Sequence, residues 1–193
     1  MITWERLDEA CHSCGRCGLC QTRHNVVIGD GARDAKIMLV GEGPGEQEDL
    51  QGRAFVGPAG QLLDKMLACI GLDRTQVYIA NIVKCRPPHN RDPHPDEQTA
   101  CLPFLRAQLK LVQPKIIVCL GRIAAQAIIR PDFRIIREHG RWEERVGYYL
   151  TATYHPSALL RDPSKKRDAY EDLKKIRAKL DELSDSFEED LLL

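Results

Sequence analysis

Short runs of apolar residues recur along the chain, and each is followed by glycine or by a polar residue. Their length and their content of β-branched residues are typical of buried strands. They cover residues 36–41, 77–80, 115–120 and 149–154. Because nearly continuous apolar runs are buried on both faces of a sheet, we predict a central, mostly parallel, four-stranded sheet.

Apolar residues at helical spacing fill the intervals between these runs. The helices predicted in this way cover residues 60–71, 97–112 and 164–183, with a short Ala- and Ile-rich helix after Gly121. Residues 133–150 alternate weakly, which indicates a hairpin or meander, and residues 11–34 are expected to be irregular. Strands that alternate with helices indicate the α/β class, and we predict a single three-layer α/β/α domain.

Three loops rich in glycine and polar residues leave the carboxyl ends of predicted strands. They cover residues 41–45, 81–90 and 155–161. In open parallel sheets, ligands bind beyond the carboxyl ends of the strands. The sequence therefore places a candidate site at one edge of the sheet.

The formal charges sum to zero, with 28 Lys and Arg against 28 Asp and Glu among 193 residues. A neutral chain argues against nucleic-acid binding by bulk charge. Residues 181–193 hold six acids and no Lys or Arg, so residues 1–180 hold 28 basic and 22 acidic residues. We therefore predict a domain at 1–180 that is basic enough for phosphate contacts, and a flexible acidic tail at 181–193. Apolar residues within the tail would allow it to dock on a partner or to compete with DNA.

No apolar stretch approaches the ~18–20 residues that a membrane span needs. The N-terminus lacks a basic start followed by an apolar run, so we expect a cytoplasmic protein without membrane contacts. In a reducing compartment, the eight cysteines favour a metal or cluster site over disulfides. Four of them lie close together, at Cys11, Cys14, Cys17 and Cys20. Four thiolates suit either an iron–sulfur cluster or zinc.

At the three loops the chain resembles the family-4 uracil-DNA glycosylases, the iron–sulfur type of bacteria and archaea. The matching segments are residues 41–49 (Gly-Glu-Gly-Pro-Gly-Glu-Gln-Glu-Asp), 52–57, 81–88 (Asn-Ile-Val-Lys-Cys-Arg-Pro-Pro), 90–91 and 155–161 (His-Pro-Ser-Ala-Leu-Leu-Arg). The resemblance runs from about Cys14 to Arg161, in the order and at the spacing of the family. It implies a base-excision repair enzyme that flips uracil out of single- or double-stranded DNA and hydrolyses its N-glycosidic bond. It also implies a monomer in a prokaryotic cytoplasm, associated with the nucleoid. The acidic tail lies outside the resemblance, and its own composition would allow it to dock a repair partner.

The resemblance also implies a set of residues that recognise uracil. Phe55 would stack on the flipped base, and the Asn81 amide would pair with the N3–H and O4 of uracil, which cytosine does not offer. His155 would donate to O2, where negative charge builds as the bond breaks. The main chain around Gly41 and Gly43 would contact the base.

Further residues are assigned to catalysis and to DNA contacts by the same resemblance. Glu42 would shape the catalytic site together with Asn90. Leu159, Leu160 and Arg161 would form an insertion loop, in which apolar side chains fill the gap left by the flipped base and the Arg holds phosphate. No Lys is placed as a Schiff-base nucleophile, so we expect a monofunctional enzyme; Lys84 is interpreted as a solvated lysine at a strand end.

The family pattern assigns the cluster ligands to Cys14, Cys17, Cys85 and Cys101. They would hold a [4Fe–4S] cluster with a structural role, and zinc is the alternative. Cys11 and Cys20 are left without a role. Cys69 and Cys119 lie in apolar runs and are interpreted as buried core thiols.

The sequence departs from the pattern at two places. Ala54 stands where the family usually has Pro before the stacking Phe, and Gly45 stands where other branches carry a Tyr that blocks the methyl group of thymine. Glu42 and Glu48 are the carboxylates near Gly43, where some relatives carry a water-positioning Asp, and both could instead be N-cap or solvent-facing acids.

Two other functions remain open at this point. One is a uracil-DNA-binding relative without turnover, which would carry an inserted basic loop that residues 86–96 lack. The other is an iron–sulfur electron carrier built on Cys11–Cys20, which would not need Cys85 or Cys101.

Overall fold

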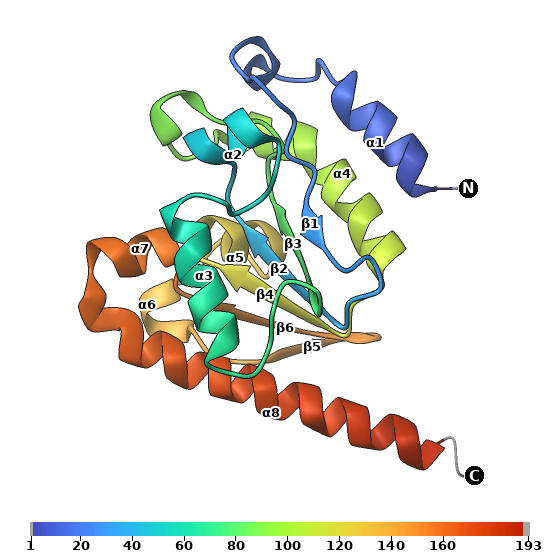
Figure 1. The fold of residues 1–193 in the computed structure, drawn as a ribbon, viewed down its shortest axis with the longest axis vertical. Coiled ribbons are helices and arrows are strands. Elements are labelled where there is room, and N and C mark those ends of the chain that lie inside the picture. The colour runs from blue at the N-terminus through green and yellow to red at the C-terminus, as the bar shows by residue number, and fades with distance from the viewer. Residues whose placement is uncertain (1, 191–193) are drawn as a thin grey trace.

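The structure is a computed structural model that describes residues 2–190, with side chains described up to residue 184. Its centre is a six-stranded sheet with the strand order β1-β3-β2-β4-β6-β5. The strands are β1 (Asp30–Gly31), β2 (Ile37–Gly41), β3 (Val77–Asn81), β4 (Ile116–Leu120), β5 (Glu143–Arg145) and β6 (Tyr148–Thr153). Figure 1 shows the sheet at the centre of the molecule.

The four inner strands are the four that the apolar runs predict, and they are parallel to one another. The sheet gains two antiparallel edge strands, β1 and β5, so the expected number of four strands is too low. Strand β5 forms a hairpin with β6 inside the segment predicted as a hairpin or meander. Neither edge strand has a buried apolar run, and therefore the apolar pattern gives no signal for them.

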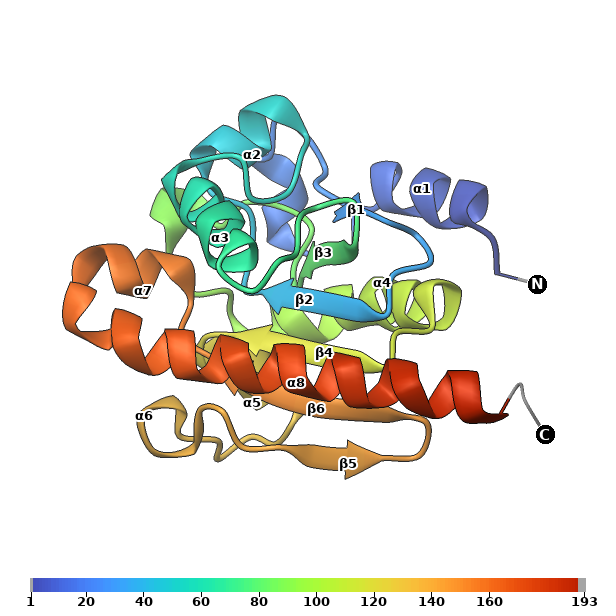
Figure 2. The ribbon, with the colours of Figure 1, turned by 60° about the horizontal axis from the view of Figure 1, so that its bottom comes forward.

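Helices cover both faces of the sheet, as the three-layer prediction requires. They are α1 (Trp4–His12), α2 (Glu46–Gln51), α3 (Pro58–Ala68), α4 (Pro95–Val112), α5 (Arg122–Ile128), α6 (Ile135–Glu138), α7 (Pro156–Arg161) and α8 (Lys166–Asp190). Short 3₁₀ turns lie at Gly18–Gln21, Pro88–Asn90 and Pro163–Lys165. Figure 2 shows α8 lying across the sheet, with α3 and α7 on the same side.

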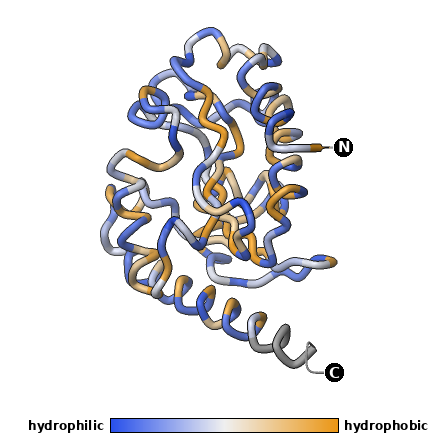
Figure 3. Tube along the Cα trace, turned by 45° about the vertical axis from the view of Figure 1, so that its right-hand side comes forward, coloured by the Kyte–Doolittle hydropathy of each residue, from blue (hydrophilic) through white to orange (hydrophobic). Residues whose placement is uncertain are grey.

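Successive strand residues point to opposite faces and build two hydrophobic cores. One core joins alternate residues such as Met38 and Val40 to helices α1, α4 and α5. The other joins Ile37 and Leu39 to α3, α7 and α8. Figure 3 shows the hydrophobic residues concentrated in the central strands. Burial on both faces explains why the inner strands have continuous apolar sequences.

The N-terminal segment contains a helix that the sequence pattern does not predict. Helix α1 begins after Thr3, whose hydroxyl accepts a hydrogen bond from the main-chain N–H of Arg6, and it buries Leu7 and Cys11. It lies beside α4 (Figure 1). The rest of the segment is irregular except for the Gly18–Gln21 turn. This arrangement brings the four N-terminal cysteines next to α4.

Helix α8 is longer than predicted and reaches Asp190. Residues 181–190 of the predicted acidic tail therefore belong to this helix, and residues 191–193 lie outside the described part of the chain. Leu173 and Ile176 bury one side of the helix against the sheet. Within the described residues, no helix combines the length and the hydropathy that crossing a membrane requires.

Candidate active site

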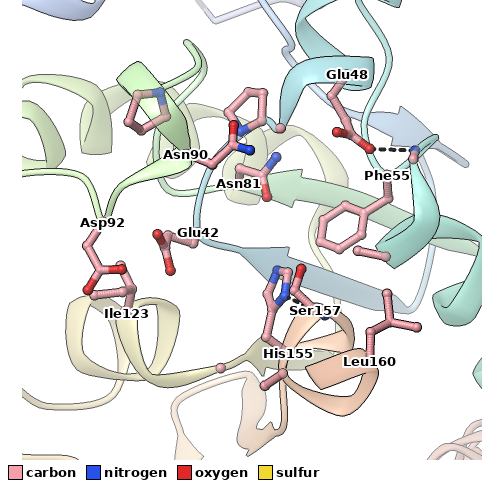
Figure 4. Close-up of a pocket in the computed structure, with 18 of the residues that line it drawn as sticks. Glu42, Glu48, Phe55, Asn81, Asn90, Asp92, Ile123, His155, Ser157 and Leu160 are labelled. Carbon is pink, nitrogen blue, oxygen red and sulfur yellow. Dashed lines mark hydrogen bonds between the residues drawn. The ribbon is translucent and has the colours of Figure 1, made fainter. Parts of the chain in front are cut away.

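A cleft of about 800 Å³ lies at the carboxyl ends of the parallel strands, where the sequence places the candidate site. All three predicted loops contribute to it. Of the predicted site residues, those that line it are Glu42, Gly43, Phe55, Asn81, Asn90, His155, Leu160 and Arg161. Figure 4 shows Asn81, Phe55 and His155 converging on the centre of the cleft from three different elements.

Asn81 is the last residue of β3 and is 1 % exposed. Its Oδ1 has no hydrogen-bond partner, and among the described side chains it is the single buried nitrogen or oxygen in that state. An unpaired buried acceptor costs ~1–3 kcal/mol. The atom is therefore ready to accept a hydrogen bond from a ligand in the cleft.

Gly41 does not line the cleft but makes room for two residues that do. A Cβ at this position would lie 2.5 Å from Asn81 Oδ1 and 2.6 Å from Phe55 Cζ. Both distances are shorter than a van der Waals contact, so a larger residue would displace the amide and the ring. Gly41 thus acts through its missing side chain.

Phe55 has a left-handed main chain with a φ of 54°, which is strained for a residue with a side chain. Its neighbours hold this conformation: Glu48 Oε1 accepts hydrogen bonds from the N–H groups of Val56 (2.8 Å) and Gly57 (2.7 Å). Arg74 donates to the carbonyl of Phe55 on the other side. The ring is thereby fixed 5.6 Å from the His155 ring, centroid to centroid.

Glu48 and Arg74 hold the loop of Phe55, a role that the sequence did not indicate for either residue. Glu48 is buried and holds a loop, so its interpretation as an N-cap or solvent-facing acid is wrong. Its position seven residues before Phe55, in a glycine-rich segment, is the signal that was available. Arg74 comes from the turn before β3, and no motif marks it.

His155 follows β6 and caps α7. Its Nδ1 lies 3.1 Å from the main-chain nitrogen of Ser157. Because an amide N–H only donates, Nδ1 must be the acceptor, and the proton of the neutral ring is on Nε2. Burial, together with the positive charge of Arg161, lowers the pKa of His155 to about 4. At neutral pH the residue is therefore an uncharged Nε2–H donor.

Glu42 is the carboxyl group of the cleft whose acidity is most altered. Burial, together with the negative charge and a hydrogen bond of Asp92, raises the pKa of Glu42 to about 7. Asp92 is held by Arg122, whose Nη2 lies 2.5 Å from its Oδ2. Figure 4 shows Glu42 and Asp92 on the same side of the cleft. Asp92 was not among the predicted site residues, although it lies two residues after Asn90.

Asn90 lies in the loop after β3 and has a left-handed main chain with a φ of 54°. Its Oδ1 accepts a hydrogen bond of 2.8 Å from Nε of Arg86. This bond orients the amide so that its NH₂ group is the part left for the cleft.

Of the predicted insertion loop, two residues are accessible. Leu160 is 45 % exposed and lines the cleft, and Arg161 is exposed at the end of α7. Leu159 is 1 % exposed and packs in the core under α7. Successive helical residues point in different directions, so Leu159 and Leu160 cannot both face outward. The prediction that Leu159 contacts DNA does not fit its burial.

A second, smaller cavity lies between the N-terminal segment, the loop after β3 and α4. Its lining includes all four predicted ligands together with the two unassigned N-terminal cysteines: Cys11, Cys14, Cys17, Cys20, Cys85 and Cys101. The cysteines are free thiols. No group of three or more His, Cys, Asp or Glu among the described residues is arranged to hold a single metal ion.

The donor chemistry of this cavity fits a thiolate-bound cluster. Arg23 Nη1 lies 3.3 Å from Cys85 Sγ, and the main-chain N–H of Lys84 lies 3.3 Å from Cys101 Sγ. Such N–H···S contacts stabilise negative charge on sulfur. The cavity also joins distant parts of the sequence, because its cysteines come from the N-terminal segment, from the loop after β3 and from α4.

Three other sequence interpretations are settled by burial. Cys119 is a buried core thiol, as expected. Cys69 follows α3 and is exposed, so its assignment to the core is wrong: the apolar run around it is one face of a helix, and Cys69 lies off that face. Lys84 is 2 % exposed, so it is not a solvated strand-end lysine.

The chain is similar to known proteins over most of its length. The model of the family described as "Uracil DNA glycosylase superfamily" matches residues 28–178. A type-4 uracil-DNA glycosylase of Sulfurisphaera tokodaii is 46 % identical over 186 residues, which cover 92 % of this chain and 84 % of that protein. Those of Archaeoglobus fulgidus and Thermotoga maritima are 47 % and 43 % identical, over 85 % and 90 % of this chain and 86 % and 93 % of theirs. The chain belongs to the type-4 uracil-DNA glycosylases of this superfamily.

Proposed function

We propose that this protein removes uracil from DNA. It takes the uracil nucleotide out of the base stack and hydrolyses the bond between C1′ and N1, which releases uracil and leaves an abasic site. The observation that carries the proposal is the unpaired Oδ1 of Asn81, buried beside the ring of Phe55 and across the cleft from His155.

Asn81 recognises uracil by the pattern of its donors and acceptors. Its Oδ1 accepts from N3–H of uracil, and its NH₂ group donates to O4. Cytosine carries an acceptor at N3 and a donor at N4, so both contacts would fail. Each unpaired buried group costs ~1–3 kcal/mol, which corresponds to about five- to 150-fold discrimination. The ring of Phe55 replaces the stacking that the base loses on leaving the helix.

His155 and Glu42 act on opposite sides of the breaking bond. As the C1′–N1 bond breaks, its electron pair moves onto uracil, and the Nε2–H of His155 donates to O2, where the charge accumulates. Glu42 in its carboxylate form orients a water molecule and accepts its proton as the water oxygen bonds to C1′. Asn90, beside it, contributes its NH₂ group to the same water.

DNA is held around the cleft by the exposed part of α7. Leu160 fills the space that the flipped nucleotide leaves, and Arg161 contacts a phosphate. Gly43 lines the cleft and allows the main chain to approach the base closely, whereas Gly41 leaves room for the Asn81 amide and the Phe55 ring. The whole site is formed by one chain, which supports a monomer as the active unit. Residues 1–180 form the catalytic domain, and residues 181–193 are an acidic extension suited to a partner in DNA repair.

The cofactor that suits the second cavity is a [4Fe–4S] cluster held by Cys14, Cys17, Cys85 and Cys101. When bound, it supplies cross-links that tie the N-terminal segment to α4 and to the loop after β3. That loop also carries Asn90, so a bound cluster would help to hold this side of the cleft in place. Zinc, the alternative drawn from the sequence, suits these thiols less well, because no three His, Cys, Asp or Glu among the described residues are arranged around a single ion. A broad absorbance near ~400 nm in anaerobically purified protein distinguishes the cluster from zinc.

The activity is tested with single- and double-stranded oligonucleotides that carry one uracil. After incubation and alkaline treatment, we expect cleavage at the uracil position and release of free uracil. The same oligonucleotides with cytosine or thymine at that position are the controls. Intact DNA would contradict the proposal, and a denaturant-stable protein–DNA adduct in its place would identify a binding protein without turnover.

A further inference from the structure

Lys84 is a buried lysine for which the proposed chemistry has no use. It is 2 % exposed and follows β3 closely in the chain. Its Nζ lies 2.8 Å from the main-chain carbonyl oxygen of Asn81 and 2.5 Å from Oε1 of Gln108. Both partners are uncharged, so neither neutralises the ammonium. A buried cation in such surroundings is strongly unfavourable unless a negative charge lies nearby.

The cysteine cavity, which Lys84 also lines, would supply this negative charge. Lys84 lines the cysteine cavity, its main-chain N–H points to Cys101 Sγ, and Cys85 follows it directly. Arg16 and Arg23 also line the cavity but are more exposed than Lys84. A cluster bound by four thiolates carries a net negative charge. Lys84 is thus the cation with the least access to water beside that charge.

The position of the ammonium is fixed by a chain of hydrogen bonds. The NH₂ group of Gln108 donates to the carbonyl of Ile28 (2.8 Å) and to the hydroxyl of Tyr78 (2.9 Å). A carbonyl only accepts, so the amide of Gln108 has one possible orientation, with Oε1 turned to Lys84. The network therefore directs Nζ to one place, between Gln108 and the carbonyl of Asn81.

We propose that Lys84 is a positioning residue that couples the cysteine cavity to uracil recognition. Its charge balances the ligating thiolates, and its ammonium holds the carbonyl of Asn81. Fixing this carbonyl fixes the main chain from which the Asn81 amide reaches into the cleft. The inference rests on the proposed cluster and gives it a second role: its charge keeps in place the lysine that orients the base-reading residue.

Four variants separate this role from general stability. Lys84→Met removes the charge and both hydrogen bonds, whereas Lys84→Gln keeps a donor for the Asn81 carbonyl without a charge. Gln108→Leu removes the anchor but leaves the charge and the bond to Asn81. Lys110→Met removes one exposed positive charge from the same helix as Cys101 and Gln108 and is the matched control.

Three quantities are measured on the full-length holoprotein. Iron per protein, and its loss in the presence of a chelator, reports on the cluster. The inhibition constant of free uracil reports on the base site alone, and the affinity for uracil-free single-stranded DNA reports on the remaining contacts. Thermal unfolding is recorded for every variant, so that effects of lower protein stability can be separated from effects on the cluster and on the base site.

For Lys84→Met we expect faster iron loss and an inhibition constant for uracil that rises about tenfold, with unchanged affinity for uracil-free DNA. For Lys84→Gln we expect faster iron loss with most of the uracil affinity retained. Gln108→Leu should lose thermal stability but keep iron and uracil affinity closer to wild type than Lys84→Met does. Lys110→Met should match wild type in all three quantities.

The proposal is overturned if Lys84→Met keeps the wild-type inhibition constant for uracil, or if Lys110→Met weakens uracil binding as much as Lys84→Met. Should Lys84→Met fail to fold, Lys84→Gln decides: iron retention equal to wild type would overturn the charge-balancing role. Failure of the cluster proposal is seen separately, as wild-type protein without iron. Failure of the proposed activity is also separate, as wild-type protein that contains iron but leaves uracil in DNA.

Discussion

A Cβ on Gly41 would lie 2.5 Å from Oδ1 of Asn81, so the base-reading amide occupies space that only glycine leaves free. The two residues pair in register at the ends of β2 and β3. The candidate site is therefore built where two neighbouring parallel strands end. The same close contact includes the ring of Phe55, so one missing side chain serves both recognition residues.

Gly41→Ala is expected to abolish most activity while the protein stays folded. The added methyl group would push the Asn81 amide or the Phe55 ring out of place by several tenths of an ångström. Because small displacements in a catalytic site are costly, we expect kcat/KM to fall about a hundredfold. Steady-state kinetics and circular dichroism check this. Gly71→Asn, at an exposed left-handed turn with open space for a side chain, is the control and should keep wild-type activity.

Asn81→Leu tests whether recognition costs stability. The leucine removes an acceptor that is buried without a partner, and it is close to asparagine in size. We expect the loss of uracil excision together with unchanged or increased stability, by about 1 kcal/mol. Chemical denaturation measures the free energy of unfolding. A clear loss of stability would show that Asn81 has a structural partner and is not held ready for the base.

Glu48 offers a test of how the stacking ring is held. Both main-chain N–H groups donate to the same carboxylate oxygen, Oε1, so Glu48→Gln retains an acceptor and Glu48→Leu does not. We expect Glu48→Gln to lower kcat/KM by less than about tenfold. Glu48→Leu leaves two N–H groups unpaired and releases the strained main chain of Phe55, so a loss of about a hundredfold is expected. Equal effects of the two variants would contradict this role.

Much of the architecture follows from sequence patterns, and the failures have physical reasons. The inner strands are continuous apolar runs because both faces are buried. The polar, glycine-rich loops that follow three of these strands predict the position of the cleft. The edge strand at Asp30–Gly31 has no such pattern, because main-chain pairing alone defines it. The motifs lead to Asn81, Phe55 and His155, because each lies in a segment that resembles the family.

The residues that hold these groups in place are not visible in the sequence. Arg74, Asp92 and Gln108 act through contacts with segments far away in the chain, and no local pattern marks them. Lys84 looks like a surface residue because lysine is rarely buried. Only the three-dimensional arrangement, in which its neutral partners and the cysteine cavity surround it, reveals its position.

The two neighbouring leucines of α7 give a matched pair for DNA contact. Leu160→Ala removes an exposed side chain at the cleft, so we expect excision from double-stranded DNA to fall more than excision from single-stranded DNA, where no stacked gap must be filled. Leu159→Ala removes a core side chain and should lower the free energy of unfolding by ~2–5 kcal/mol, without a selective effect on the duplex. The ratio of the two activities, together with thermal unfolding, distinguishes them. A duplex-selective defect in Leu159→Ala would contradict a purely structural role for this buried leucine.

The pH dependence of excision should report the ionisation of Glu42. The pKa of Glu42 is raised to about 7, so its carboxylate forms as pH rises through that value. If the carboxylate orients the water, kcat falls about tenfold for each pH unit below 7 and levels off above it. His155, whose pKa is lowered to about 4, stays neutral over this range. It therefore adds no second pH-dependent limb to the profile of kcat against pH.

Two variants identify the titrating group. Glu42→Gln should lose most activity and all of the limb near pH 7. Asp92→Asn removes the negative neighbour that raises the pKa of Glu42, so its limb should move to lower pH. Stability provides an independent check of the sign. A carboxyl group with a folded-state pKa above its unfolded value binds its proton more tightly when folded, so the free energy of unfolding falls as pH rises from about 4.3 to 7. Glu42→Gln should remove that slope, and a limb that persists unchanged in Glu42→Gln would assign the ionisation to another group.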